Sequence, residues 1–242
     1  RFMEENKRCL YDDGIGYIEL LNTMGTDKCV VDSARVSFNK DNHADSLLTD
    51  KDVKLINYLA TNKHTSPFEH CSMTFRVKVP LIVARQHMRH RTWSYNEVSR
   101  RYTSENIEMY IPTAFRKQHS SNRQASTEED MNPILKTVKG STLTYTSTAR
   151  DLVKSSSRKC LSLYNQLLEA GVCREQARLV LPQSMYTEYW CTANLLNIIK
   201  FLKLRLPKES QWEIRRLAEE MSYFVKIMFP EVYKACIKTD LD

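Results

Sequence analysis

Glycine is scarce in this chain, with five glycines among 242 residues. The fragment Gly14-Ile15-Gly16 lacks the third glycine of a dinucleotide-binding fingerprint, and the sequence contains no GxxxxGK[ST] phosphate loop. If the protein binds phosphate groups, we therefore expect it to bind them with side chains and helix N-termini.

Paired cysteines and long apolar runs are also missing. The seven cysteines are scattered, and no two of them form a CxxC motif. This odd, dispersed set argues against a disulfide framework and against a structural zinc site. Apolar runs such as LIVA (81–84) are too short to span a membrane, and no charged-then-apolar signal segment opens the sequence. We expect a cytoplasmic protein with no membrane partner.

Positive charge is in excess: 36 lysines and arginines face 29 acidic residues, which gives a formal charge of +7. This excess suggests a polyanionic partner without choosing among nucleic acid, nucleotide and phosphorylated cofactor. The length suits one large domain or two small ones, and the 42% apolar content is ordinary for a globular protein.

The periodicity of apolar residues predicts the main elements. The alternating segment CSMTFRVKVP (71–80) predicts a half-buried strand, and Pro80 suits the start of a helix over LIVARQHMRH (81–90). The segment ENIEMYIP (105–112) alternates again and predicts a second strand. The order of elements predicts an α/β fold of the α+β type, with a central, mostly antiparallel sheet packed with helices and a helical C-terminal half. Further helices are expected at 50–62, capped by Thr49 or Asp50, at 147–170 ending before Gly171, at 173–181, at about 187–204, and from about 208 onward.

The segment 116–148 differs from the rest. RKQHSSNRQASTEEDMNP is polar, and GSTLTYTST follows it after a short apolar patch. We interpret the segment as a polar insertion on the surface rather than as a linker between two domains.

The segment RHRTWSYNEVSRRY (89–102) concentrates positive charge. From Arg85 to Arg101 there are five arginines against one carboxylate, Glu97. All the cations are arginine, whose planar fork binds phosphate in a bidentate manner and stacks on aromatic rings. The neighbouring serines and asparagine supply hydrogen-bonding groups, as a pocket requires. A solvated basic face is the other interpretation of such a run, but this pattern favours a phosphate pocket.

The spacing of this segment resembles the RHRxxSxNExSxR signature of the flavin-dependent thymidylate synthases. The resemblance covers roughly residues 30–115 and 160–235, and it implies a single domain over 1–242 with an insertion at about 116–148. Other segments that are similar to the family, in the same order, are HTSPFEH (64–70), ARQ (84–86), ARLVLP (177–182), the Asn194 segment, LKLR (202–205) and QWEIRR (211–216).

This resemblance implies a methyltransferase that converts dUMP to dTMP. It implies 5,10-methylenetetrahydrofolate as the carbon donor and NADPH as the reductant, acting through bound FAD. It also implies a homotetramer with active sites built from several subunits, and neither a nucleic-acid partner nor a metal. The phosphates of these ligands and the glutamate of folate suit an arginine-rich site without glycine loops.

The resemblance also assigns residues, position by position. It makes Arg205 the catalytic residue at the uracil edge, where it favours ionisation at N3. Three positions depart from the family, because Leu196, Lys200 and Glu209 stand where members often have arginine, asparagine and histidine. The implied dUMP contacts are Gln86, Arg89, Glu97, Val98, Ser99, Arg100, Arg101, Arg178 and Arg205. The implied FAD contacts are Ser66, Arg89, His90, Arg91, Glu97, Asn194 and Lys200.

Two other functions compete with this one. A basic nucleic-acid-binding protein would use segment 89–102, with Trp93, Tyr95 and Tyr102 stacking on bases. A metal-dependent phosphohydrolase would use the histidines, although their spacing matches no standard ligand set. Those histidines are His64, His70, His87 and His90.

Overall fold

The centre of the fold is a five-stranded sheet in which every neighbouring pair is antiparallel. The structure, a computed structural model, describes residues 6–38, 47–139 and 143–237. In spatial order the strands are β1 (Lys7–Cys9), β2 (Tyr17–Met24), β3 (Ser72–Pro80), β9 (Tyr186–Asn194) and β4 (Ser94–Glu97). The expected α+β fold with a mostly antiparallel sheet is confirmed.

Strand β3 shows why the sheet has one buried face. Its residues Met73, Phe75, Val77 and Val79 are fully buried, whereas the residues between them are half-buried. Successive side chains of a strand point to opposite faces, so the alternation in the sequence places one apolar row on the core side. The predicted strand at 71–80 is confirmed, and α3 (Leu81–His87) begins directly after Pro80.

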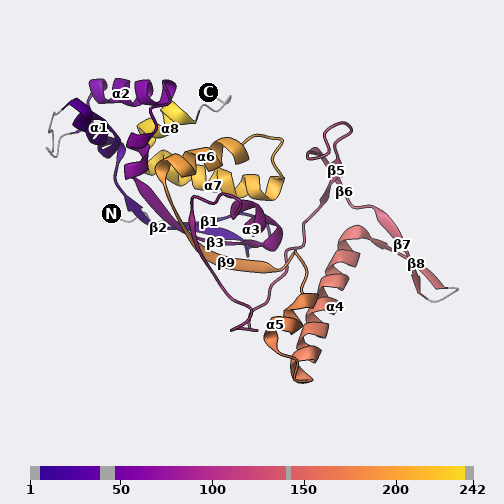
Figure 1. Cartoon of the computed structure of the whole chain (residues 1–242). Coiled ribbons are helices and arrows are strands. Elements are labelled where there is room, and N and C mark those ends of the chain that lie inside the picture. Colours follow the sequence, from indigo (N-terminus) through magenta and orange to yellow (C-terminus); the bar gives the residue numbers. More distant parts are fainter. Residues whose placement is uncertain (1–5, 39–46, 140–142, 238–242) are drawn as a thin grey trace.

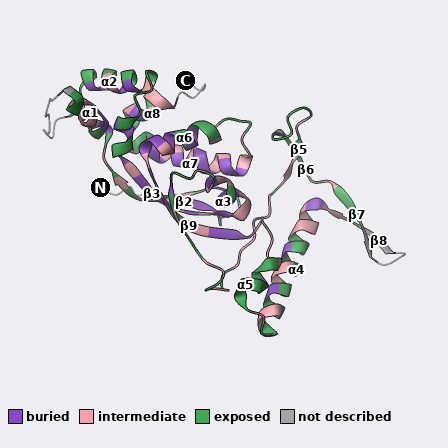
Figure 2. Ribbon diagram, viewed as in Figure 1, coloured by how far each residue is buried: buried purple, intermediate pink, exposed green. Residues whose placement is uncertain are grey.

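Three helices cover the buried face of the sheet. They are α3, α6 (Leu195–Arg205) and α7 (Trp212–Met228). In Figure 1 they lie over one face, and Figure 2 shows the strands and these helices buried where they meet. The ring of Phe75 in β3 lies 6.1 Å from that of Phe224 in α7. The core therefore sits between the sheet and the helical C-terminal half.

Strand β9 overturns one prediction. A helix was expected at about 187–204, but residues 186–194 form a strand paired with β3 along its full length, from Ser72↔Asn194 to Pro80↔Tyr186. The buried residues Tyr189, Cys191 and Ala193 alternate along it. Aromatic and β-branched residues favour a strand here, and pairing with the central strand decides the outcome. The helix begins only at Leu195.

A second group of helices closes one end of the sheet (Figure 1). Thr49 caps α2 as predicted: its hydroxyl accepts from the backbone N–H of Asp52, and the Asp52 carboxylate accepts from the backbone N–H of Thr49. The carboxylate of Asp27 accepts from the backbone N–H groups of Glu231 and Val232 at the start of α8. The elements here are α1 (Asp27–Arg35), the 3₁₀ turn η1 (Val36–Phe38), α2 (Asp50–Thr61), η2 (Ser66–His70) and α8 (Pro230–Cys236).

The remaining elements project away from the sheet, as Figure 1 shows. The polar insertion folds as two hairpins, although its residues 140–142 lie outside the described residues. The strand expected at 105–112 is wrong, because only Met109 makes a bridge, to Met185. The predicted helix at 147–170 is confirmed, and Gly171 follows it with a φ of +86°. The elements are β5 (Phe115–Gln118), β6 (Ser126–Met131), β7 (Ile134–Lys139), β8 (Leu143–Thr148), α4 (Ala149–Glu169), α5 (Arg174–Ala177) and η3 (Arg178–Val180).

Within the described part of the chain, no helix combines the length and the apolar character needed to cross a lipid bilayer.

Candidate active site

The turn that follows α3 presents the arginines of the signature. Backbone bonds from Arg89 N–H to the Gln86 carbonyl and from His90 N–H to the His87 carbonyl close the turn tightly. Arg89 and Arg91 are exposed, and no carboxylate among the described residues pairs with either. Because these cations are not neutralised by the protein, the turn is suited to bind an anionic ligand.

Arg205, the last residue of α6, meets this turn. Its Nε donates to Nε2 of His90 at 3.3 Å. Burial, and then the charge of Arg205, lower the pKa of His90, so the imidazole is neutral at pH 7 and can accept this bond. Burial also lowers the pKa of Arg205 from its ordinary value, although a guanidinium remains charged near neutrality. The structure thus brings the predicted catalytic residue beside a predicted flavin contact.

An aromatic cluster packs against the turn on the side of the core. His87 is fully buried, and its Nδ1 forms a 2.8 Å hydrogen bond with the Tyr189 hydroxyl. Trp93 is 6% exposed, and its ring stands edge-on to that of His87 at 4.7 Å. Trp93 therefore has no free face on which a base could stack, whereas Tyr102, a second aromatic of the nucleic-acid-binding interpretation, is 79% exposed. The cluster fixes the turn on the core.

Strand β4 and the loop after it hold a second group of predicted residues. The Thr187 hydroxyl in β9 donates to Oε1 of Glu97 at 2.6 Å. The backbone N–H of Arg101 donates to the Ser99 hydroxyl at 3.2 Å. Val98 and Arg100 line a cavity of about 280 Å³ beside Thr187.

Arg100 and Arg101 of this loop each contact a different part of the chain. Nη1 of Arg100 donates to the Glu105 carbonyl at 2.8 Å, and burial lowers the pKa of Arg100. Arg101 lies 3.7 Å from the Glu175 carboxylate, and Nε of Arg178 donates to the Glu175 carbonyl at 3.3 Å. Glu175 in α5 thus links Arg101 to Arg178, which lies 77 positions later in the sequence.

Of the other predicted flavin contacts, Asn194 lies at the opposite end of α6 from Arg205. Asn194 caps this helix, and its side-chain oxygen accepts from the backbone N–H of Asn197 at 3.0 Å. Ser66 and Lys200 are exposed, the first in η2 and the second midway along α6. At about 1.5 Å of rise per residue, Asn194 and Arg205 are about 16 Å apart along the helix. Within one chain, the predicted contacts near Asn194 and those near Arg205 therefore form separate groups.

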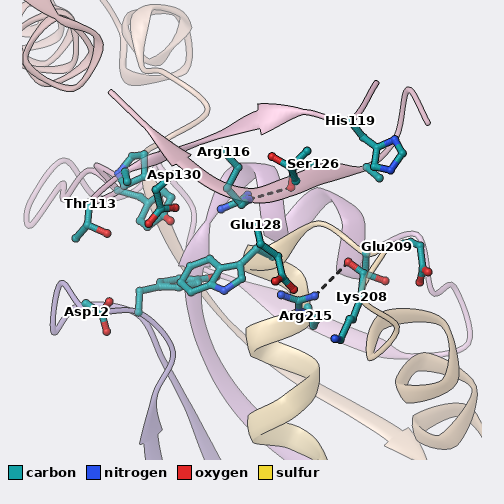
Figure 3. A pocket seen from close by; sticks show the side chains of 18 of the residues that line it. Asp12, Thr113, Arg116, His119, Ser126, Glu128, Asp130, Lys208, Glu209 and Arg215 are labelled. Carbon is teal, nitrogen blue, oxygen red and sulfur yellow. Dashed lines mark hydrogen bonds between the residues drawn. The ribbon is translucent and has the colours of Figure 1, made fainter. Parts of the chain in front are cut away.

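The three departures from the family pattern fall in different environments. Leu196 is buried in the hydrophobic core, so it cannot replace an arginine as a ligand contact. Glu209 is exposed and lines a cavity of about 690 Å³. Figure 3 shows this cavity, with Arg116 and Ser126 of the first hairpin on one side and Lys208 and Arg215 on the other. None of the predicted contacts lines it.

The sequence did not reveal a series of hydrogen-bonded side chains that begins at Gln86 in α3. The side-chain amide of Gln86 donates to that of Gln211, which donates to Glu213 at 2.9 Å, and Glu213 in turn pairs with Arg116. The motif QWEIRR contains two of these residues, but nothing in its spacing indicates that they contact Gln86 or the insertion. Only the packing of α3 against α7 brings them together.

The described residues build no metal centre, and the two buried cysteines are not thiolates. No three His, Cys, Asp or Glu side chains in that part of the chain are placed to hold a metal ion. Burial raises the pKa of Cys71 to about 12, and it also raises that of Cys191, so both buried thiols stay protonated at pH 7. What the exposed part of the site offers is hydrogen-bond donors and positive charge.

Known proteins resemble this chain over most of its length. The family described as "Thymidylate synthase complementing protein" matches residues 19–231. The flavin-dependent thymidylate synthase of Thermus thermophilus is 41% identical over 220 residues, which cover 91% of this chain and 75% of that protein. The enzyme of the same name from Thermosipho africanus is 39% identical over 224 residues, covering 92% and 91%.

A solved structure agrees with these sequence relatives. The UMP/dUMP methylase PolB from Streptomyces cacaoi, bound with 5-Br dUMP, matches with a TM-score of 0.74 at 31% identity, covering 90% of this chain and 93% of that one. The class of protein follows from the shared fold and from these relatives: it is an enzyme, a methyltransferase. Within that class the chain belongs to the family of flavin-dependent thymidylate synthases.

Proposed function

We propose that the enzyme methylates dUMP to dTMP, with 5,10-methylenetetrahydrofolate as the carbon donor and NADPH as the reductant, through bound FAD. The observation that carries this proposal is the turn after α3, which holds the exposed Arg89 and Arg91 next to Arg205. The relatives support it, because they are named flavin-dependent thymidylate synthases and PolB was solved with a brominated dUMP.

The chain has residues that fit FAD. Arg89 and Arg91 offer uncompensated positive charge for its pyrophosphate, and the exposed Ser66 offers a hydroxyl. The side-chain oxygen of Asn194 is occupied by the cap of α6, which leaves its amide NH₂ to donate to a ligand. Bound FAD would supply the transfer of a hydride from NADPH to the carbon that is being reduced. The contacts proposed for FAD are Ser66, Arg89, His90, Arg91, Glu97, Asn194 and Lys200.

For dUMP we assign binding and polarisation to different groups. The phosphate and sugar are held by arginines of the turn and the loop, together with Gln86 and Ser99. Arg205 lies at the uracil edge, where its charge stabilises negative charge that develops at N3 and so makes the ring a better nucleophile. Neutral His90 fixes the Arg205 guanidinium through their hydrogen bond. The contacts proposed for dUMP are Gln86, Arg89, Glu97, Val98, Ser99, Arg100, Arg101, Arg178 and Arg205.

A homotetramer is part of this proposal. The contacts lie in separate groups on one chain, so a single site that touches all ligands takes residues from more than one subunit. Leu163 in α4 and Leu179 in η3 are exposed apolar residues on the projecting part of the molecule, where a second subunit could cover them. Light scattering after size-exclusion chromatography tests this: a mass of about four chains of 28.4 kDa is expected, and a monomer would contradict it.

Purified protein tests the main proposal directly. A yellow preparation is expected, whose flavin absorbance is bleached by NADPH and which forms dTMP when dUMP and methylenetetrahydrofolate are added. The opposite result is colourless protein that takes up no FAD and binds oligonucleotides with a steep salt dependence. That outcome would support nucleic-acid binding and reject the thymidylate synthase function.

A further inference from the structure

Arg116, the first residue of the polar insertion, contacts a buried carboxylate of the core. Its Nη2 donates to both oxygens of Glu213, at 3.0 and 2.9 Å, and its Nε donates to Ser126 at 3.1 Å. Glu213 is 5% exposed and lies in the first turn of α7. A carboxylate this buried requires a charge partner, because an unpaired buried charge costs several kcal/mol or more. The insertion supplies that partner.

Glu213 also fixes the orientation of a glutamine. Both carboxylate oxygens already accept from Arg116, and Oε2 accepts as well from Gln211 at 2.9 Å. Because an ionised carboxylate can only accept, the group that Gln211 turns toward it must be the NH₂. The side-chain oxygen of Gln211 therefore points the other way, toward Gln86.

The same logic fixes Gln86. Since the oxygen of Gln211 can only accept, Gln86 turns its own NH₂ toward it. The side-chain oxygen of Gln86 is then left for other partners, and it can serve a ligand only as an acceptor. The orientation of both side-chain amides thus follows from the Glu213 carboxylate. It does not depend on which atom of each amide was assigned as nitrogen and which as oxygen.

We propose that Arg116, Glu213 and Gln211 are positioning residues that hold the Gln86 side-chain oxygen toward the nucleotide. This inference rests on the proposed function, in which Gln86 contacts dUMP. It adds that the contact is made to a hydrogen-bond donor of the nucleotide, the deoxyribose hydroxyl, and not to its phosphate. It also gives the insertion a role in the site, exerted from its first residue.

The isosteric variant Glu213→Gln tests the direction of the hydrogen bonds that link Glu213, Gln211 and Gln86. The amide that replaces the Glu213 carboxylate can donate as well as accept, so both glutamines are free to reverse and Gln86 can present its NH₂. We expect dUMP affinity, measured by calorimetry on the flavin-loaded enzyme, to fall about tenfold, the equivalent of one well-placed hydrogen bond. Gln86→Ala should cause a loss of similar size.

A double-mutant cycle separates positioning from a general effect on the fold. In the Gln86→Ala background, adding Glu213→Gln should change dUMP affinity less than about twofold, because the group being positioned is gone. The inference is wrong if Glu213→Gln weakens dUMP binding by the same factor with Gln86 present and in the Gln86→Ala background. It is also wrong if Glu213→Gln leaves dUMP affinity unchanged when Gln86 is present. Failure of the unaltered enzyme to bind dUMP would overturn the proposed function and the inference together.

Arg116→Gln provides a second test if Glu213→Gln does not fold. The change leaves the buried Glu213 without its cation, which favours the protonated form of its carboxyl group. A protonated carboxyl group can donate, so both glutamines are again free to reverse. The same weakening of dUMP binding is therefore expected, and it should be absent in the Gln86→Ala background. Lys117→Gln is the matched control: it removes one positive charge from the next position of β5, and Lys117 pairs only with the exposed Glu129 among the described residues. Equal losses from Arg116→Gln and Lys117→Gln would mean that overall charge, and not position, controls affinity.

Discussion

Arg205 and His90 form a cation–imidazole pair in which the guanidinium Nε donates to Nε2 at 3.3 Å. The bond joins the C-terminal end of α6 to the turn after α3. It requires a neutral imidazole, and the lowered pKa of His90 is consistent with that requirement. The orientation of Arg205 is therefore coupled to the turn that carries Arg89 and Arg91.

Arg205→Ala should abolish dTMP formation while flavin remains bound. The loss of a preorganised charge at the uracil edge is expected to lower turnover about 100- to 1,000-fold. Steady-state assays give the turnover, and flavin absorbance after gel filtration gives the occupancy. Lys203→Ala is the control, because Lys203 is exposed in the same last turn of α6. Full activity of Arg205→Ala would show that the assigned role is wrong.

Thr187→Val should weaken ligand binding without unfolding the protein. The Thr187 hydroxyl donates to Glu97 at 2.6 Å, and valine keeps the shape while removing the donor. A Glu97 side chain freed from this bond should bind dUMP about three- to tenfold more weakly. Thr192→Val on the same strand is the control, since its hydroxyl bonds only to Thr74 among the described side chains. Equal effects of the two variants on dUMP binding would contradict the role of Glu97.

His87 should make stability depend on pH in acid. Burial, and then the charges of His90 and Arg205, lower its pKa from 6.5 to about 3. Between these two values the unfolded chain binds a proton that the folded protein does not, so stability rises with pH by up to about 1.36 kcal/mol per unit. The contribution is complete above pH 6.5 and is lost as the pH falls toward 3.

The variant His87→Phe isolates this contribution. Urea unfolding from pH 7 to pH 4 should give a shallower loss of stability for the variant than for the unaltered protein. The variant will also lose the bond to Tyr189, which lowers its stability equally at every pH in this range. Parallel curves for the two proteins would show that His87 does not titrate on unfolding.

Asp27→Ala should destabilise the end of the molecule that α1 and α8 form. Its carboxylate accepts from the backbone N–H groups of Glu231 and Val232, which alanine would leave without that partner. A loss of about 1 to 3 kcal/mol is expected in chemical unfolding. Asp32→Ala on the same helix, which among the described residues breaks only a pair with Lys28 one turn away, should cost about 0.5 kcal/mol or less. Comparable losses would argue against a capping role for Asp27.

Local patterns predicted the elements whose buried face is visible in the sequence. The alternation at 71–80 and the cap at Thr49 are signals of this kind, and both are confirmed. Strand β9 was missed because an apolar, aromatic run satisfies strand and helix alike until its partner is known. The hairpins of the insertion were missed because polar strands away from the core carry little alternation.

The candidate site shows the same limit. The turn with Arg89 and Arg91 could be found from sequence, because its residues are neighbours and their spacing is a signature. The contact between Arg116 and Glu213 spans 97 positions and depends on how the insertion folds back over α7. No periodicity encodes a contact of this kind, so only the three-dimensional structure could reveal it.

The direct passage from β3 into α3 at Pro80 has a consequence for hydrogen exchange. There is no loop between the central strand and the helix that carries the arginine turn, so the turn has no hinge of its own. Segments joined in this way open together with the core that they belong to. Amides of α3 should therefore exchange as slowly as those of β3, so the turn that carries Arg89 and Arg91 should open only when the whole fold unfolds.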